Sequence, residues 1–294
     1  MRIFLIGILL WFGQNLYAQN MQGNVKDAEV GKPIEFASVY YKIKNSGVYT
    51  DLNGNFKFNQ IPNDTLIISA LGYKKIEIPS SDLSSFLKIK MEPLVFQLEN
   101  VEFFNNVSRS IGNKKIDIGN LSRDKSTLIS GIKGRTVALY VQPKNLKIGQ
   151  ITALKFGISS IQEALVKVHL FNVDPDTGEP GEEIFLEKNI IKVKNGQNKL
   201  HYKLENQKIF IDNNGVFVAL EWLGNADFTQ TSNITNPYYT SSKSKSAGQI
   251  YTRFMEKDWE QYLVSYTAAN SKKEKKEGPG VYFHEPNFKI TLKY

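Results

Sequence analysis

Period-two alternation of apolar and polar residues is the feature that most constrains the fold of this chain. Apolar residues occupy every second position in KLHYKLE (residues 199–205), at Val216, Val218, Leu220 and Trp222, and at Phe288, Ile290 and Leu292. Successive side chains of a strand point to opposite faces, so the pattern predicts strands with one buried face. Asn-Gly pairs at 53–54, 195–196 and 214–215 predict turns between them. Helical periodicity is almost absent, and we expect an all-β protein.

Composition narrows the class of protein. The 294 residues include no cysteine, which excludes disulfides and cysteine-ligated metals. Hydrophobic residues make up 41% and charged residues 22%, as in ordinary globular chains. The net charge is +8, but the densest basic run, residues 272–277, is interrupted by glutamates. We interpret that run as a solvated loop and expect no nucleic-acid partner.

The first residues have the pattern of an export signal. Arg2 precedes a short apolar stretch at residues 3–12, and Ala18 offers a small residue for cleavage. No later segment approaches the roughly 20 apolar residues of a spanning helix. Residues 1–18 are therefore predicted to be a signal peptide, with no transmembrane helix. We expect the mature protein in the periplasm, in the outer membrane or on the cell surface of a bacterium.

Turn chemistry and composition divide the mature chain. Residues 97–130 contain polar stretches typical of a linker or a weakly ordered edge strand. Residues 131–294 hold about nine or ten strand-like runs. This number of strands predicts a jelly-roll-like β-sandwich. No repeat of 20 to 50 residues is present, which disfavours solenoids and propellers.

Residues 20–96 resemble a known family. GNVKD (23–27), GKPI (31–34), GVYTD (47–51) and GNF (54–56) occur in order, followed by DTLIIS (64–69) and Gly72-Tyr73. This string is similar to the carboxypeptidase-like regulatory domain, found in many Bacteroidetes proteins. The resemblance implies a transthyretin-like, seven-stranded β-sandwich. In the same stretch, the turn at residues 51–54 places a glycine where positive φ is needed.

That resemblance implies no peptidase activity, because the accessory domain of the family carries no zinc ligands. The sequence adds no catalytic pattern of its own: no nucleophile elbow, P-loop or dinucleotide-binding glycine motif is present. His169, His201 and His284 have no carboxylate at the spacing of a zinc peptidase. His169 and His201 alternate with apolar neighbours, which predicts partly exposed surface positions. We expect no enzymatic activity.

Two segments are candidate binding sites. Carboxylates crowd one turn at Asp174, Asp176 and Glu179, and such a turn could bind Ca²⁺, although the EF-hand spacing is missing. No other cofactor is expected. The segment 225–248 is polar and carries Tyr238 and Tyr239, with Trp259 following. Aromatic faces beside amides and hydroxyls are typical of glycan sites, whereas a plain surface loop is the alternative.

The prediction is a non-catalytic, exported cell-envelope protein that binds a glycan or an envelope protein partner. The alternative is a small outer-membrane β-barrel that carries an N-terminal sandwich domain. That alternative depends on the last seven residues, FKITLKY, which alternate and end on an aromatic residue. Against it, many strand-like runs are shorter than the 9 to 11 residues of a membrane strand.

Overall fold

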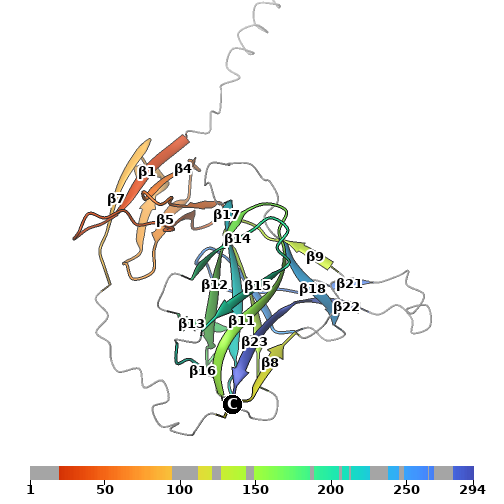
Figure 1. Cartoon of the computed structure of the whole chain (residues 1–294). Coiled ribbons are helices and arrows are strands. Elements are labelled where there is room, and N and C mark those ends of the chain that lie inside the picture. Colours follow the sequence, from red (N-terminus) through yellow and green to blue (C-terminus); the bar gives the residue numbers. More distant parts are fainter. Residues whose placement is uncertain are drawn as a thin grey trace, which may run out of the picture. The chain divides into compact units, whose positions relative to one another are not determined.

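The computed structural model describes residues 20–94, 112–120, 127–143, 149–185, 189–204, 207–211, 213–225, 238–244, 248–263, 265–267 and 281–294. The predicted signal peptide lies outside these residues. The chain divides into two compact units, Met1–Val95 and Phe96–Tyr294 (Figure 1). In the described part, the structure is built from strands, with one 3-10 turn, η1 (Ser80–Asp82), and contains no helix able to span a membrane.

The first unit is a seven-stranded sandwich, as predicted. One sheet has the order β4 (Asn55–Asn59), β1 (Asn20–Asp27), β7 (Phe86–Met91). The other has the order β3 (Gly47–Tyr49), β2 (Ser38–Tyr41), β5 (Thr65–Ser69), β6 (Ile76–Pro79). β1 and β7 run parallel, and every other pair is antiparallel. The alternating pattern of β1, β4 and β7 turns one face of their sheet into a shared core and the other toward solvent.

The turn at residues 51–54 has the predicted chemistry. Gly54 has φ +75°, a conformation that side chains with a Cβ rarely adopt. The Asp51 carboxylate accepts hydrogen bonds from the backbone N–H groups of Asn53 and Asn55, at 2.9 and 2.8 Å. These bonds fix the connection between β3 and β4.

The second unit is a sandwich of two larger sheets. The seven-stranded sheet has the order β13 (Pro180–Glu183), β12 (Ala164–Val173), β17 (Val216–Asn225), β10 (Arg135–Val141), β19 (Ile250–Phe254), β20 (Glu260–Gln261), and β14 (Ile190–Val193) also pairs with β12. The nine-stranded sheet has the order β21 (Ser265–Thr267), β22 (Val281–Pro286), β18 (Tyr238–Ser244), β11 (Gly149–Ser159), β23 (Phe288–Lys293), β8 (Lys115–Gly119). β15 (Lys199–Lys203) and β16 (Phe210–Ile211) also pair with β11, and β9 (Thr127–Ser130) pairs with β18.

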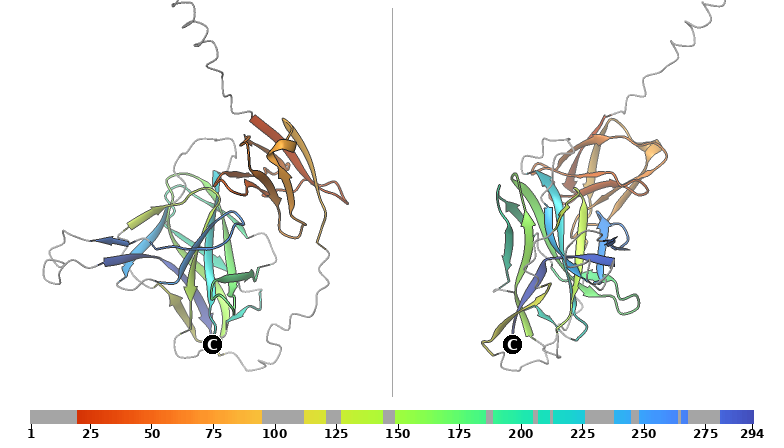
Figure 2. Two further views of the ribbon diagram at one scale, coloured as in Figure 1. Left: turned by 180° about the vertical axis from the view of Figure 1, so that it is seen from behind. Right: turned by 90° about the vertical axis from the view of Figure 1, so that its right-hand side faces the viewer.

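The chain passes repeatedly between these sheets, from β10 to β11, β12, β15, β17, β18, β19 and β22 in turn (Figure 2). This alternation is what a jelly-roll-like sandwich requires. Two strands, β8 and β9, lie within residues 97–130, the segment predicted as a linker or edge strand. β8 forms the edge of the nine-stranded sheet, beside β23.

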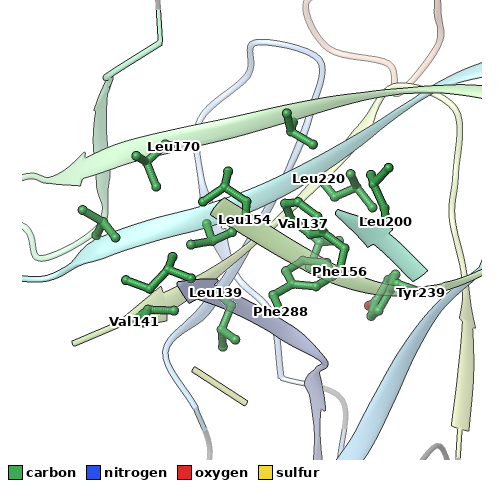
Figure 3. Close-up of a cluster of buried hydrophobic side chains, with 14 of the residues drawn as sticks. Val137, Leu139, Val141, Leu154, Phe156, Leu170, Leu200, Leu220, Tyr239 and Phe288 are labelled. Carbon is green, nitrogen blue, oxygen red and sulfur yellow. The ribbon is translucent and has the colours of Figure 1, made fainter. Parts of the chain in front are cut away.

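One apolar core fills the space between the two sheets of the second unit (Figure 3). The inward-facing residues of β10, β12 and β17 meet those of β11, β15, β18 and β23 there. Near its centre, the Phe288 ring lies 4.9 Å from that of Phe156 and 5.9 Å from that of Tyr239. Phe288 is fully buried, so its removal would leave a cavity bounded by both sheets.

We expect Phe288→Ala to lower the free energy of unfolding of the second unit by about 3–5 kcal/mol. Chemical denaturation followed by tryptophan fluorescence measures this, because Trp222 and Trp259 both lie in that unit. Ile161→Ala is the control, since the Ile161 side chain is 55% exposed in the same unit. An effect of Phe288→Ala no larger than that of the control would contradict the packing described.

Candidate functional site

The outer face of the seven-stranded sheet carries a cluster of aromatic rings. The Phe171 and Trp259 rings pack edge to face at 5.2 Å, and Phe217 packs against Tyr251 at 5.5 Å and Tyr140 at 5.3 Å. We call these five residues the outer aromatic cluster. Phe171 and Phe217 are buried, whereas the other three rings are half-buried and form its surface. The buried rings of Phe171 and Phe217 therefore support the three half-buried rings that lie over them.

Two alanines form the floor beneath these rings. Ala138 of β10 and Ala219 of β17 are register partners, and both are fully buried. Their small side chains leave room for larger neighbours to pack down onto the sheet. The guanidinium of Arg253 lies 5.1 Å from the Phe171 ring and 4.4 Å from the Trp259 ring. A cation over two aromatic faces is a favourable arrangement that fixes the position of both groups.

A buried histidine that contacts two carboxylates adjoins the cluster. His169 is 2% exposed and stacks on Phe171, with 5.4 Å between ring centroids. Its Nδ1 lies 2.8 Å from Oε1 of Glu183, and its Nε2 lies 2.9 Å from Oε2 of Glu221. The three residues come from β12, β13 and β17, so this contact ties three strands together.

The charges around Glu183 keep it ionised. Burial alone would raise the pKa of its carboxyl group. The hydrogen bond and charge of His169, together with the charges of Lys167 and Arg253, outweigh burial and hold that pKa below its ordinary value. The Lys167 ammonium lies 4.0 Å from Oε2 of Glu183. These charged side chains border the half-buried rings of the outer aromatic cluster.

The structure separates the residues predicted for a glycan site. Trp259 belongs to the outer aromatic cluster on the seven-stranded sheet. Tyr238 and Tyr239 lie on β18 of the nine-stranded sheet, and neighbouring residues of a strand face opposite ways. Tyr239 is 1% exposed and packs against Trp222 in the core, where burial raises the pKa of its hydroxyl. Tyr238 is half-buried. Most of the predicted loop, residues 226–237 and 245–247, lies outside the described residues.

The acidic turn has a structural explanation. Oδ1 of Asp174 accepts hydrogen bonds from the backbone N–H groups of Asp176 and Thr177, at 3.0 and 2.8 Å, and from the Thr177 hydroxyl at 3.0 Å. These bonds lower the pKa of Asp174 and close the turn between β12 and β13. Among the described residues, no three His, Asp or Glu side chains are grouped as a metal site. Calcium binding at Asp174, Asp176 and Glu179 stays a prediction.

Two expectations about burial were wrong. His169 is not a partly exposed surface residue, because two carboxylates bind both of its ring nitrogens in the interior, whereas His201 is exposed as expected. β17 is buried on both faces rather than on one. One residue of the sequence could have indicated the burial of His169 and of both faces of β17. It is Glu221, a carboxylate within the apolar run VFVALEWL (216–223). A buried carboxylate needs a partner, and the partner is the histidine of the neighbouring strand.

Comparison with known proteins supports the assignment of the first unit. Residues 21–102 match the family model described as CarboxypepD_reg-like domain. The chain carries a carboxypeptidase-regulatory-like domain at its N-terminal end. The comparison with curated proteins finds no match.

Two solved structures from Bacteroides uniformis are similar to the chain. A "putative carbohydrate binding protein" has 10% sequence identity and a TM-score of 0.22, over 94% of this chain and 98% of that one. A DUF3823 family protein has 10% identity and a TM-score of 0.18, over 76% and 96%. At these TM-scores, neither likeness carries an argument about fold or ligand.

The pKa of Glu183 leads to a prediction about pH. A carboxyl group whose pKa is lower in the folded state stabilises the protein above its unfolded pKa, ordinarily about 4.5, and this contribution is lost as pH falls through the folded pKa. We expect Glu183→Gln to cost about 2 kcal/mol of unfolding free energy at pH 7. The difference between wild type and variant should shrink as pH falls below about 4.5, as measured by denaturation at several pH values.

The control is Glu163→Gln, because Glu163 forms an exposed ion pair with Lys192 at 2.6 Å. Exposed pairs contribute little, and we expect no measurable change. A gap between wild type and Glu183→Gln that persists at acid pH would show that the pair with His169 is not its source.

Proposed function

We propose that this chain is a non-catalytic binding protein of the bacterial cell envelope, and that its second unit binds a glycan on the outer aromatic cluster. The observation that carries the proposal is the layered arrangement of that cluster. Half-buried rings of Tyr140, Tyr251 and Trp259 lie over fully buried Phe171 and Phe217. A free protein that already holds its rings in place loses little conformational entropy on binding.

The chemistry of the cluster suits a sugar ring. Pyranose rings present apolar C–H faces that pack on aromatic side chains, while their hydroxyl groups need hydrogen-bond partners nearby. Trp259 and Tyr251 offer the aromatic surface. The guanidinium of Arg253 and the carboxylate of Glu183 offer a donor and an acceptor at its border. Aromatic residues of this kind give large contact area at low entropic cost.

The proposal of a non-catalytic role is supported by how the nearby carboxylates are used. Glycoside hydrolysis needs two carboxyl groups on either side of a scissile bond, one of them able to give up a proton. Glu183 and Glu221 instead bind opposite nitrogens of one histidine. The lowered pKa of Glu183 also makes it a poor proton donor at neutral pH.

Export is part of the proposal and is supported by the sequence around Arg2 to Ala18. Strand β1 begins at Asn20, so cleavage after Ala18 would leave the first sandwich intact. Mass spectrometry of protein from the envelope fraction should give an N-terminus at Gln19 or Asn20. Recovery of uncleaved chain from the cytosol would contradict export.

The glycan proposal is tested with single substitutions on the two sheets. Trp259→Ala and Tyr251→Ala should each weaken retention on envelope polysaccharide about tenfold, since loss of one stacked ring costs on the order of 1–3 kcal/mol by analogy with base stacking. Tyr238→Ala is the matched control, a half-buried tyrosine on the other sheet. Affinity electrophoresis in gels containing the polysaccharide measures the effect.

Three results would contradict this assignment. Loss of retention in Tyr238→Ala alone would move the site to the nine-stranded sheet. Capture of a defined envelope protein, with no retention on any polysaccharide, would favour the protein-partner function. Release of sugar fragments by purified protein would show that the chain is an enzyme.

A further inference from the structure

The first unit presents an open sheet face of unusual composition. Strands β1, β4 and β7 point alternate side chains away from the core, and these outward residues are exposed except for the half-buried Asn24. Four are lysines, five are amides and one is an aromatic residue, with no Asp or Glu among them. They are Asn20, Gln22, Asn24, Lys26, Asn55, Lys57, Asn59, Phe86, Lys88 and Lys90. We call this surface the lysine–amide face.

The register of the strands brings positive charges together. Lys26 of β1 is the direct partner of Lys90 of β7 in the parallel pair, and Lys88 is the next outward residue along β7. Neighbouring strands lie about 4.8 Å apart. Like charges opposite one another destabilise a sheet. Three lysines at one end of the face therefore repel one another in the free protein, and an anion would relieve that repulsion.

Two lysines elsewhere in this unit have carboxylate partners. Lys42 pairs with Glu77 at 3.2 Å, and Lys74 pairs with Glu92 at 2.8 Å. Across residues 20–94, no carboxylate oxygen lies within 4.0 Å of any lysine of the lysine–amide face. Glu92, the acidic residue that follows β7, is already paired with Lys74. The positive charge of the face is thus not neutralised within its own unit.

The amides and the aromatic residue indicate which anion fits. Nδ2 of Asn24 donates to Oδ1 of Asn55 at 2.8 Å and to the Asn53 carbonyl at 2.9 Å, which holds a row of amides across two strands. Gln22 lies between Lys57 and Phe86 in the next row. Exposed amides can bind hydroxyl groups, ammonium groups bind carboxylates or sulfates, and the 51% exposed ring of Phe86 can pack on the face of a sugar.

We propose that the lysine–amide face binds an acidic polysaccharide, one whose sugars carry carboxylate or sulfate groups. This goes beyond the proposed glycan site, because it lies on the other unit and takes a charged ligand. A single-stranded nucleic acid fits less well, since its bases need several stacking rings and the face has one. A membrane surface would need several apolar residues that insert, whereas this face carries one, Phe86.

The test uses the full-length mature protein and two pairs of polymers: polygalacturonate with its methyl ester, and dextran sulfate with dextran. Within each pair the backbone is the same and only the charge differs. We expect binding to the charged polymers at low salt, and none to the neutral ones. Lys88→Gln/Lys90→Gln should weaken binding to the charged polymers about tenfold or more and roughly halve its salt dependence.

The matched control is Lys44→Gln/Lys75→Gln, which removes the same charge from exposed positions of the same unit outside the three strands. It should change binding less than twofold, and Trp259→Ala should leave it unchanged, which separates this face from the proposed glycan site. Equal weakening by both double variants would show an effect of net charge alone and overturn the proposal. So would equal binding to charged and neutral polymers, unchanged binding after Lys88→Gln/Lys90→Gln, or failure to bind either charged polymer at low salt.

Discussion

Strand β17 is buried on both faces, and the arrangement of the second unit depends on this constraint. Residues 216–224 are all buried, although only one face of the strand points between the sheets. The other face must be covered by groups from the same sheet, because burial of apolar surface is the main favourable term in folding. Tyr140, Tyr251 and Trp259 provide that cover. The candidate binding surface is therefore the outer layer of a second, smaller core.

The charged contact beside that cover follows from the same constraint. Glu221 lies on the outer face of β17, where a lone carboxylate would be costly to bury. His169 of β12 and Glu183 of β13 complete a bridge that satisfies it. Such contacts hold strands in one register but add little net stability compared with apolar packing. Here the contacts of His169 with the two carboxylates fix the position of Phe171, on which the histidine ring stacks.

Much of the fold could be predicted from the sequence, because strands and turns depend on neighbouring residues. Alternation predicted β23, and the need for positive φ predicted the turn at Gly54. The site could not be predicted in the same way. Alternation shows that Tyr238 and Tyr239 face opposite ways but not which of them faces the core. The partners of His169 lie 14 and 52 residues away, and only the strand order brings them together.

The central claim is that ligand binds on the outer face of the seven-stranded sheet of the second unit. Hydrogen–deuterium exchange of the mature protein, with and without envelope polysaccharide, tests it most directly because it locates protection along the chain. We predict slower exchange in peptides that cover β19, the turn to β20 and the β12–β13 hairpin, with residues 238–244 unchanged. Protection confined to residues 238–244, or none in the second unit despite retention of the protein on the polysaccharide, would contradict the account.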